Sequence, residues 1–284
     1  MQPHLTLSPD AAIDLHMHTT YSDGRWSAEQ LVAYLADEGF ALAAVTDHNR
    51  VDMVAHIQAL GAARNLPVLA AVEMSTTWRG RMGDLLCYGF DPMHNALAPL
   101  AEWIVSQQLE NTHAVHEKLL LQGYRFPRQD ELLAENAGKL RLPMDNITLL
   151  RAHGYASSFA EALHLITEAG FRSIEVDMAE AIEATHRSGG VCLIAHPGRR
   201  DLGFTFYTPD LLDEVRAELP LDGIEVYHPS HTPELVETYL AYAREHTLLQ
   251  STGSDSHGQP ARPPIKYRAE ISRALLARVG IEVQ

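Results

Sequence analysis

Strand-like and helix-like segments alternate over the first 75 residues, and this alternation limits the possible folds more than any other feature. Short apolar runs are typical of buried strands, and the longer segments between them are typical of helices. The first helix has a start signal, because Ser27 can act as its N-cap and Gln30 lies at the capping-box position. Strands separated by helices predict a parallel sheet. The expected strands are residues 12–18, 41–46 and 68–74, and the expected helices are residues 27–38 and 51–64.

The alternation stops after one further expected strand at residues 84–90 and returns later in the chain. The stretch between has mostly helical character. We therefore expect one barrel-like α/β domain, formed by residues 1–95 and 171–284, that is interrupted by a mostly helical subdomain at residues 96–170. An open, doubly wound sheet is the alternative. The later expected elements are helices at 177–188, 209–219 and 233–246 and strands at 191–196, 223–228 and 247–254.

Net charge and cysteine usage limit the partners and the compartment. The formal net charge of −15 argues against a long nucleic acid duplex as partner, because such binding depends on Lys and Arg that neutralise phosphates. A small phosphorylated ligand is still compatible, because a bound metal ion can supply local positive charge. Cys87 and Cys192 both lie in apolar runs, so no disulfide framework is expected, which fits a reducing cytoplasm. We expect neither an export signal nor a membrane-spanning segment.

Side chains that can bind metal ions recur where the expected strands end. His16 and His18 are two residues apart on one strand, so both point to the same side. In parallel α/β folds the carboxyl ends of the strands meet where ligands bind. Any one of these side chains could instead be a cap or a turn residue, but their repeated placement favours a metal site. The candidate ligands are His16, His18, Asp23, His48, Glu73, His196, Asp255 and His257, and Asp47, His228 and His231 lie beside them.

The types of donor atom indicate which metals fit. Imidazole nitrogen together with carboxylate oxygen suits zinc, manganese or iron, and no set of thiolates favours a zinc finger. So many donors together predict more than one divalent ion.

The motifs HMH…SDG, TDHN, VEMS, AHPG and GSDSH, taken together, resemble the polymerase and histidinol phosphatase (PHP) superfamily. Their order, the position of the insert and the segment VYHPSHTPE are similar to the small bacterial phosphoesterases of that superfamily. These include nucleoside 3′,5′-bisphosphate phosphatases and 5′-to-3′ exoribonucleases. The resemblance covers nearly the whole chain and implies a distorted (β/α)7 barrel with an inserted subdomain. It also implies two or three divalent ions, which are Mn, Fe or Zn.

The resemblance further implies how the ligands divide among the ions, with Asp47 orienting a ligand or a neighbouring strand end. Relatives have a histidine on the strand after VEMS and a His-Phe-Ala-Arg segment in the insert. This chain has Leu86 and Asp145–Thr148 at the matching positions. Leucine cannot bind a metal ion, so the third site is expected to be weaker, empty or completed by another residue. The implied sets are His16, His18, Glu73 and Asp255 for one ion, Asp23, His48 and His257 for another, and Glu73 with His196 for a third.

These features predict a metal-dependent phosphoesterase that hydrolyses a phosphomonoester by a metal-activated hydroxide. Arg199 would hold a phosphate, or else form a surface salt bridge. His231 or His228 would protonate the leaving oxygen, or else make loop hydrogen bonds. The expected substrate is a nucleotide, such as a nucleoside 3′,5′-bisphosphate or the 5′ end of short RNA. The alternatives are another small metabolite such as histidinol phosphate, and a metal-binding domain without catalysis.

Overall fold

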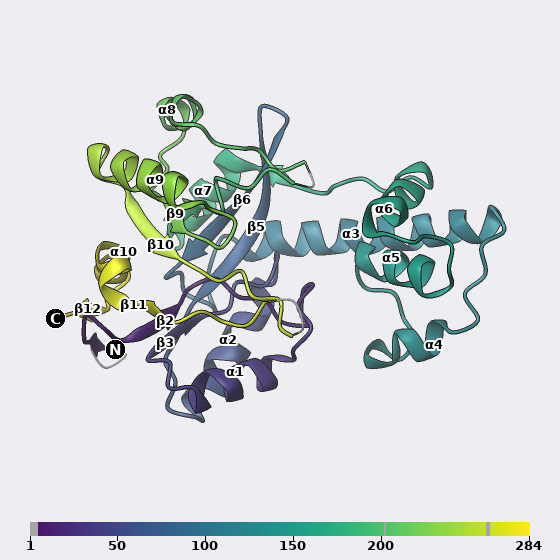
Figure 1. Ribbon diagram of the computed structural model, residues 1–284, viewed down its shortest axis with the longest axis horizontal. Coiled ribbons are helices and arrows are strands. Elements are labelled where there is room, and N and C mark those ends of the chain that lie inside the picture. Colours follow the sequence, from purple (N-terminus) through teal and green to yellow (C-terminus); the bar gives the residue numbers. More distant parts are fainter. Residues whose placement is uncertain (1–4, 202, 260–261) are drawn as a thin grey trace. The chain divides into compact units, whose positions relative to one another are not determined.

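The chain divides into two compact units, one formed by Met1–Ala101 with Glu175–Gln284 and the other by Glu102–Ile174. Figure 1 shows the helices and strands of this computed structural model. The inserted subdomain expected at 96–170 stays a prediction. The first four residues, on which the expectation of no export signal partly rests, lie outside the described residues. The described residues are 5–201, 203–259 and 262–284.

Two main sheets make up the first unit. The strands are β1 (Thr6–Leu7), β2 (Ala12–Asp14), β3 (Leu42–Ala44), β4 (Val68–Leu69), β5 (Ala71–Trp78), β6 (Arg81–Tyr88), β7 (Val176–Asp177), β8 (Val191–Ile194), β9 (Gly223–Tyr227), β10 (Leu249–Thr252), β11 (Tyr267–Arg268) and β12 (Glu282–Val283). The larger sheet has the order β10-β9-β8-β6-β5-β7, the smaller has the order β11-β2-β3-β4, and β1 pairs with β12. Most neighbouring strands are parallel, and the α/β class is confirmed.

The larger sheet is mixed, because β6 runs antiparallel to both of its neighbours, β5 and β8. The cause is a tight hairpin in which Trp78 pairs with Arg81, while Arg79 and Gly80 between them have φ values of 49° and 72°. Two successive positive φ values are typical of a type I′ turn, whose twist matches that of the strands it joins. The expectation of a parallel sheet for the first 75 residues is confirmed for β2, β3 and β4, and the strand expected at 84–90 is the one that runs antiparallel.

Backbone hydrogen bonds link the two sheets at two places. The amide of Leu15, just after β2, donates to the carbonyl of Thr252 at the end of β10 (3.2 Å). The amide of Glu73 in β5 donates to the carbonyl of Thr46, which follows β3 (3.1 Å). The ladders are not continuous across these places in the described residues, so closure into the expected barrel stays a prediction.

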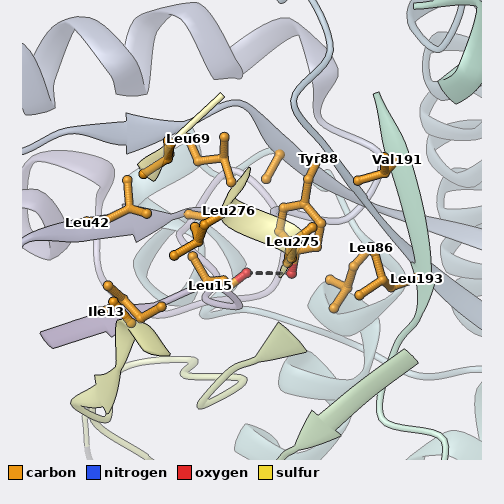
Figure 2. Close-up of a cluster of buried hydrophobic side chains, with 14 of the residues drawn as sticks. Ile13, Leu15, Leu42, Leu69, Leu86, Tyr88, Val191, Leu193, Leu275 and Leu276 are labelled. Carbon is orange, nitrogen blue, oxygen red and sulfur yellow. Dashed lines mark hydrogen bonds between the residues drawn. The ribbon is translucent and has the colours of Figure 1, made fainter. Parts of the chain in front are cut away.

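One hydrophobic cluster is shared by both sheets, and Figure 2 shows its side chains. Leu42 of the smaller sheet and Leu86 and Leu193 of the larger sheet are buried in it. The hydroxyl of Tyr88 in β6 donates to the carbonyl of Leu15 (2.8 Å), which is the dashed line in Figure 2. Burial of each such apolar side chain contributes about 1.5–3 kcal/mol, so the cluster holds the sheets together and fixes the positions of the strand ends.

Helices pack on the sheets of the first unit. They are α1 (Ala28–Asp37), α2 (Val54–Ala62), α7 (Met178–Arg187), α8 (Pro209–Glu218), α9 (Pro233–Glu245) and α10 (Arg273–Arg278), with 3-10 turns at Val51–Met53 and Ala269–Ser272. α7 packs against β5, β6 and β8, and α9 packs against β9 and β10 (Figure 1). The expected start of α1 is confirmed, because Ser27 Oγ accepts from the amide of Gln30 and Gln30 Oε1 accepts from the amide of Ser27.

The second unit is helical and contains most of α3. Its helices are α3 (Ala98–Leu121), α4 (Gln129–Leu132), α5 (Pro143–Ala152) and α6 (Phe159–Glu168), with a 3-10 turn at Ala134–Asn136. Within the segment Asp145–Thr148, Asn146 Nδ2 donates to the carbonyl of Thr112 (2.9 Å), and its Oδ1 lies 2.9 Å from His116 Nδ1. These contacts hold α5 against α3. In the part of the chain that the structure describes, no helix has the length and apolar character that a membrane crossing needs.

Candidate metal centre

Four side chains from three strands converge at one place. His16 and His18 follow β2, Glu73 lies in β5, and Asp255 follows β10. Nε2 of His16 lies 3.1 Å from Nε2 of His18, and Glu73 Oε2 lies 3.0 and 3.1 Å from these two nitrogens. Asp255 Oδ1 lies 3.6 Å from His16 Nε2 and 3.3 Å from His18 Nε2. The structure thus brings together the whole ligand set that the family resemblance implies for the first ion.

A second group of donors lies around the His18 ring. The imidazoles of His48 and His257 stack on this ring, with centroid distances of 4.7 and 4.4 Å. Asp23 Oδ2 lies 3.3 Å from His257 Nε2, and its Oδ1 lies 3.8 Å from His18 Nδ1. Donor atoms of all four residues lie within 4.8 Å of one another. The three ligands expected for the second ion are therefore together, and His18 lies between both groups.

His196, which follows β8, faces the second oxygen of Glu73. Its Nε2 lies 3.0 Å from Glu73 Oε1, whereas Glu73 Oε2 faces His16 and His18. Each carboxylate oxygen of Glu73 therefore points at a different set of imidazoles. This is the arrangement that a carboxylate bridging two ions needs.

Glu73 and His196 form a third group of donors, and Asp84, which is absent from the expected ligands, adds a carboxylate to it. It lies in β6 with Oδ2 3.9 Å from His196 Nε2, and its oxygen lies within 4.8 Å of donor atoms of Glu73 and His48. Leu86, the position matched to the relatives' histidine, is fully buried in the hydrophobic cluster (Figure 2). Side chains two apart on a strand point to the same face, so residues 84 and 86 share a face and only Asp84 reaches the site.

Glu225 in β9, also absent from the expected ligands, contacts two of them from behind. This buried carboxylate has Oε1 3.0 Å from His16 Nδ1, and its Oε2 accepts from the amide of His196 (2.8 Å). A carboxylate on the second ring nitrogen fixes the tautomer and the orientation of a metal-binding histidine. Gly253 allows this packing, because a Cβ there would lie 2.1 Å from His16 Cβ and 2.6 Å from Glu225 Oε1. A glutamate inside the apolar run GIEVY was the available signal.

Asp47 has contacts that suit the orienting role expected for it. Its carboxylate accepts hydrogen bonds from the amide of Thr19 (2.7 Å), the hydroxyl of Thr19 (2.6 Å) and the hydroxyl of Ser22 (2.6 Å). These bonds hold the loop between His18 and Asp23, so the two candidate ligands at its ends are fixed relative to each other.

Two candidate ligands have an unusual backbone conformation. His196 and Asp255 have φ values of 27° and 50°, in the region that residues other than glycine rarely adopt. Such strain persists only where the surroundings enforce it, and it concentrates at functional sites. Here the amide of His196 is held by Glu225, and the amide of Asp255 donates to the carbonyl of His16 (2.9 Å).

The charge balance of the first group suits cations. Burial lowers the pKa of His18, but hydrogen bonds with Asp255 and Glu73 outweigh this effect and raise the pKa to about 10. Burial also lowers the pKa of His16, and the charges of Glu73 and Glu225 outweigh it and raise the pKa well above the usual value. The carboxylates therefore attract positive charge to these rings, and a divalent ion can replace the protons.

Unsatisfied polar atoms give an independent test of whether metal ions fit the second group. Asp23 Oδ1 and His48 Nδ1 are buried and have no hydrogen-bond partner within the described ranges. A buried polar atom without a partner costs about 1–3 kcal/mol. A bound ion would satisfy both atoms, and these oxygen and nitrogen donors match Mn, Fe or Zn. The residues present therefore fit the metal ions that the motifs imply.

The two histidines predicted to act on the substrate differ in their contacts. His228 Nε2 lies 3.3 Å from Asp255 Oδ2, next to the first group. His231 has both ring nitrogens occupied by backbone groups, because Nδ1 donates to the carbonyl of Val226 (2.8 Å) and Nε2 accepts from the amide of Gly198 (3.0 Å). His228 Nδ1 lies 2.7 Å from Ser230 Oγ and accepts from the amide of Ser230 (3.1 Å), so both histidines make the loop contacts that were their alternative role. They differ in that only His228 also contacts a candidate ligand.

Arg199, three residues after His196, makes the salt bridge that was its alternative role. Its Nε donates to Asp201 Oδ1 (2.7 Å), and its guanidinium lies 4.1 Å from the ring centroid of Phe204. The Asp201 side chain is 64% exposed. Because exposed ion pairs contribute little, a phosphate can compete with Asp201 for this guanidinium.

The motifs of this site identify a family. The family model of the PHP domain matches residues 14–280, and the chain belongs to this family. The matched range contains every candidate ligand from His16 to His257. The resemblance inferred from the motifs is therefore confirmed.

Three curated relatives have different activities in their names. The phosphoribosyl 1,2-cyclic phosphate 1,2-diphosphodiesterase of Eggerthella lenta is 29% identical over 258 residues, which are 88% of this chain and 96% of that protein. The 3′,5′-nucleoside bisphosphate phosphatase of Chromobacterium violaceum is 28% identical over 263 residues, which are 87% of each protein. The 5′-3′ exoribonuclease Rnm of Escherichia coli is 29% identical over 295 residues, 95% of this chain and 91% of that protein.

A solved structure shows the same fold over nearly the whole chain. It is described as an amidohydrolase from Chromobacterium violaceum with bound sulfate and no metal. Its TM-score is 0.77 at 26% sequence identity, and the similarity covers 94% of this chain and 97% of that one.

Proposed function

We propose that this chain hydrolyses a phosphomonoester at the centre formed by the three donor groups. As a member of the PHP family it is a metal-dependent phosphoesterase. The observation that most supports the proposal is Glu73, whose Oε2 faces His16 and His18 while its Oε1 faces His196. A bridging carboxylate is typical of centres in which neighbouring divalent ions act on one phosphate.

We assign two or three ions, Mn, Fe or Zn, to the three groups. When bound, such ions act as Lewis acids on phosphoryl oxygens and lower the pKa of water. Asp84 takes the place of the histidine that relatives have, because it is the added carboxylate beside His196 and Glu73. The proposed ligands are His16, His18, Glu73 and Asp255 for the first ion, Asp23, His48 and His257 for the second, and Glu73, His196 and Asp84 for the third.

Two side chains of this protein are assigned to the substrate itself. Arg199 binds the phosphate by exchanging its exposed partner Asp201 for phosphoryl oxygens. His228 donates a proton to the leaving oxygen, because its Nε2 faces Asp255 at the edge of the first group. His231 positions the loop after His196, because both of its nitrogens bind backbone.

The substrate that we propose is a nucleotide, such as a nucleoside 3′,5′-bisphosphate or the 5′ end of short RNA. Two of the relatives are named for activities on such molecules. The net charge of −15 favours a small ligand over a long duplex. Another small phosphorylated metabolite, such as histidinol phosphate, is the alternative.

We also infer that the two sheets form one distorted (β/α)7 barrel from residues 1–95 and 171–284, with residues 96–170 as an inserted helical subdomain. The hydrogen bonds between the sheets and the hydrophobic cluster that both share support this architecture. The cysteines Cys87 and Cys192 are free and buried, which fits a reducing cytoplasm as the site of action.

The first experiment measures product formation from a panel of phosphate esters by protein reconstituted with Mn²⁺. The panel contains a nucleoside 3′,5′-bisphosphate, a short 5′-phosphorylated RNA, histidinol phosphate and a cyclic phosphodiester. We expect hydrolysis of a nucleotide, and we expect Asp255→Asn to abolish it because that variant removes a charged donor facing His16 and His18. Protein with bound ions that hydrolyses nothing in the panel would support a metal-binding domain without catalysis.

Arg199→Ala is expected to raise KM for the preferred phosphomonoester at least about tenfold. The reason is that a charge-assisted hydrogen bond contributes about 1.5–3 kcal/mol. Steady-state kinetics measure the effect, and Arg200→Ala is the matched control, because the Arg200 guanidinium stacks 3.7 Å from the ring centroid of Phe206. An unchanged KM in Arg199→Ala would exclude Arg199 from the substrate site.

A further inference from the structure

A second cluster of metal-binding side chains lies outside the candidate metal centre. His186 is in the last turn of α7, Cys192 is in β8, and Asp222 directly precedes β9. Asp222 Oδ2 lies 2.7 Å from His186 Nε2 and 3.5 Å from Cys192 Sγ, and this sulfur lies 3.9 Å from His186 Nε2. We propose that these three residues bind a zinc ion through one imidazole, one thiolate and one carboxylate.

The distances within the cluster suit a tetrahedral ion. With Zn–S near 2.3 Å and Zn–N or Zn–O near 2.0–2.1 Å, two ligand atoms in a tetrahedron lie about 3.3–3.6 Å apart. The two pairs that include the sulfur are already close to this range. His186 and Asp222 have to separate by about 0.6 Å, from 2.7 to about 3.3 Å, which replaces their hydrogen bond with two metal bonds.

The exposure of the three ligands leaves room for a fourth one from solvent. Cys192 is fully buried, whereas the side chains of His186 and Asp222 are 33% and 20% exposed. Asp222 also lines a surface cavity of about 400 Å³, so this ligand is accessible from solvent. Water can then occupy the fourth position, as in three-ligand zinc sites.

Zinc is the ion that this set of donors selects. A thiolate favours zinc over the hard ions that suit the sulfur-free catalytic groups. Burial raises the pKa of Cys192 well above the usual thiol value, so the sulfur stays protonated until a cation approaches. A coordinating zinc ion deprotonates a thiol, and the ion would then link α7, β8 and the segment before β9.

A cysteine, a histidine and an aspartate also occur together in hydrolases, but the geometry here excludes that use. In a catalytic triad the two ring nitrogens have different partners, one the nucleophile and the other the carboxylate. In this cluster the same nitrogen, His186 Nε2, faces both Cys192 Sγ and Asp222 Oδ2. The buried thiol is also out of reach of a substrate.

The cluster can be observed separately from the catalytic centre, because the chain has only two cysteines and none is among the catalytic donors. Cobalt(II) bound to a thiolate gives a strong near-ultraviolet charge-transfer absorption, and cobalt bound only to imidazole and carboxylate does not. Cys87 is directly opposite Cys192 in the β6–β8 ladder, but its sulfur contacts the Thr185 hydroxyl (3.2 Å). Cys87→Ser is therefore the matched control for Cys192→Ser.

The experiment is a Co²⁺ titration of the metal-free full-length protein, followed by near-ultraviolet absorption. We expect the charge-transfer band in the wild type and in Cys87→Ser. Cys192→Ser should lack the band, and after loading with Zn²⁺ it should contain about one equivalent of Zn²⁺ less than the wild type. His186→Ala keeps both cysteines and changes a partly exposed residue. It should weaken the Co²⁺ binding that produces the band at least about tenfold, because one of three protein ligands is removed. Phosphoesterase activity of His186→Ala should equal that of the wild type.

Two results would overturn the proposal. One is that the wild type shows no charge-transfer band although cobalt occupies its catalytic centre. The cluster would then be a His–Asp ion pair beside a thiol. The other is a band that persists in Cys192→Ser or in His186→Ala with unchanged affinity. Neither result would affect the proposed phosphoesterase function, which rests on different residues.

Discussion

Glu73→Gln is expected to lower kcat/KM for the preferred phosphomonoester by at least about 10³-fold. Glu73 is fully buried, and its two oxygens face His16 with His18 on one side and His196 on the other. Glutamine has nearly the same shape but only one oxygen and no charge, so both neighbouring sites lose the negative charge of Glu73 and one of them also loses an oxygen ligand. A loss of about 4 kcal/mol of transition-state stabilisation corresponds to this factor.

Kinetic assays together with metal analysis of the same samples measure the effect of Glu73→Gln. Glu218→Gln is the matched control, because it makes the same chemical change on the exposed face of α8 and should leave kcat/KM unaltered. Far-ultraviolet circular dichroism checks that both variants are folded. If Glu73→Gln keeps more than a tenth of the wild-type activity with a full complement of ions, the bridging role is wrong.

The candidate ligands nearest the strand ends could be chosen from the sequence because each is marked locally. His16, His48, Glu73 and His196 each lie at or near the end of an apolar run, and an α/β fold brings such ends together. The start of α1 was predictable for the same reason, because the capping box lies within four consecutive residues.

Asp84 and Glu225 could not be chosen from the sequence, because their contacts depend on pairing between strands. The hairpin at Arg79 and Gly80 reverses β6 and sets the register in which Asp84 lies opposite Ser75. A different turn would shift this register and place other residues beside Glu73. The Arg-Gly pair was a signal for the hairpin, but not for which residue lies at the candidate metal centre.

The difference between His228 and His231 is also a matter of tertiary contacts. Both lie in the motif VYHPSH and look equivalent in the sequence. Their contacts differ only in the folded protein, where the amide of Gly198 in the loop after His196 donates to Nε2 of His231. In the segment Asp145–Thr148, the contact of Asn146 with α3 likewise depends on tertiary structure, and no local pattern indicates it.

Asp84→Asn is expected to weaken binding of the third ion and to lower kcat/KM by about 10²-fold. The variant keeps the shape of the side chain and removes the charge that lies beside His196 and Glu73.

Burial and the charge of Glu73 raise the pKa of Asp84 to about 6. In metal-free protein the neutral Asp84 carboxyl therefore contributes to the stability of the folded state below its unfolded pKa of about 3.9. That contribution is lost as the pH rises through about 6, because the buried carboxyl then ionises. Metal-free Asp84→Asn should accordingly have a higher Tm than metal-free wild type above about pH 6.

Replacing residue 84 or residue 86 by histidine tests which of the two positions corresponds to the histidine that relatives have at the third site. Asp84→His should retain the third ion and most of the activity, because an imidazole then faces His196 and Glu73. Leu86→His places a polar ring inside the hydrophobic cluster, and we expect it to lower the free energy of unfolding by about 2–5 kcal/mol without adding a bound ion. Metal analysis and thermal unfolding of both variants measure this. If Leu86→His restored the ion in an Asp84→Asn background, residue 86 and not residue 84 would be the ligand position, and the match to the relatives' histidine at Leu86 would be correct.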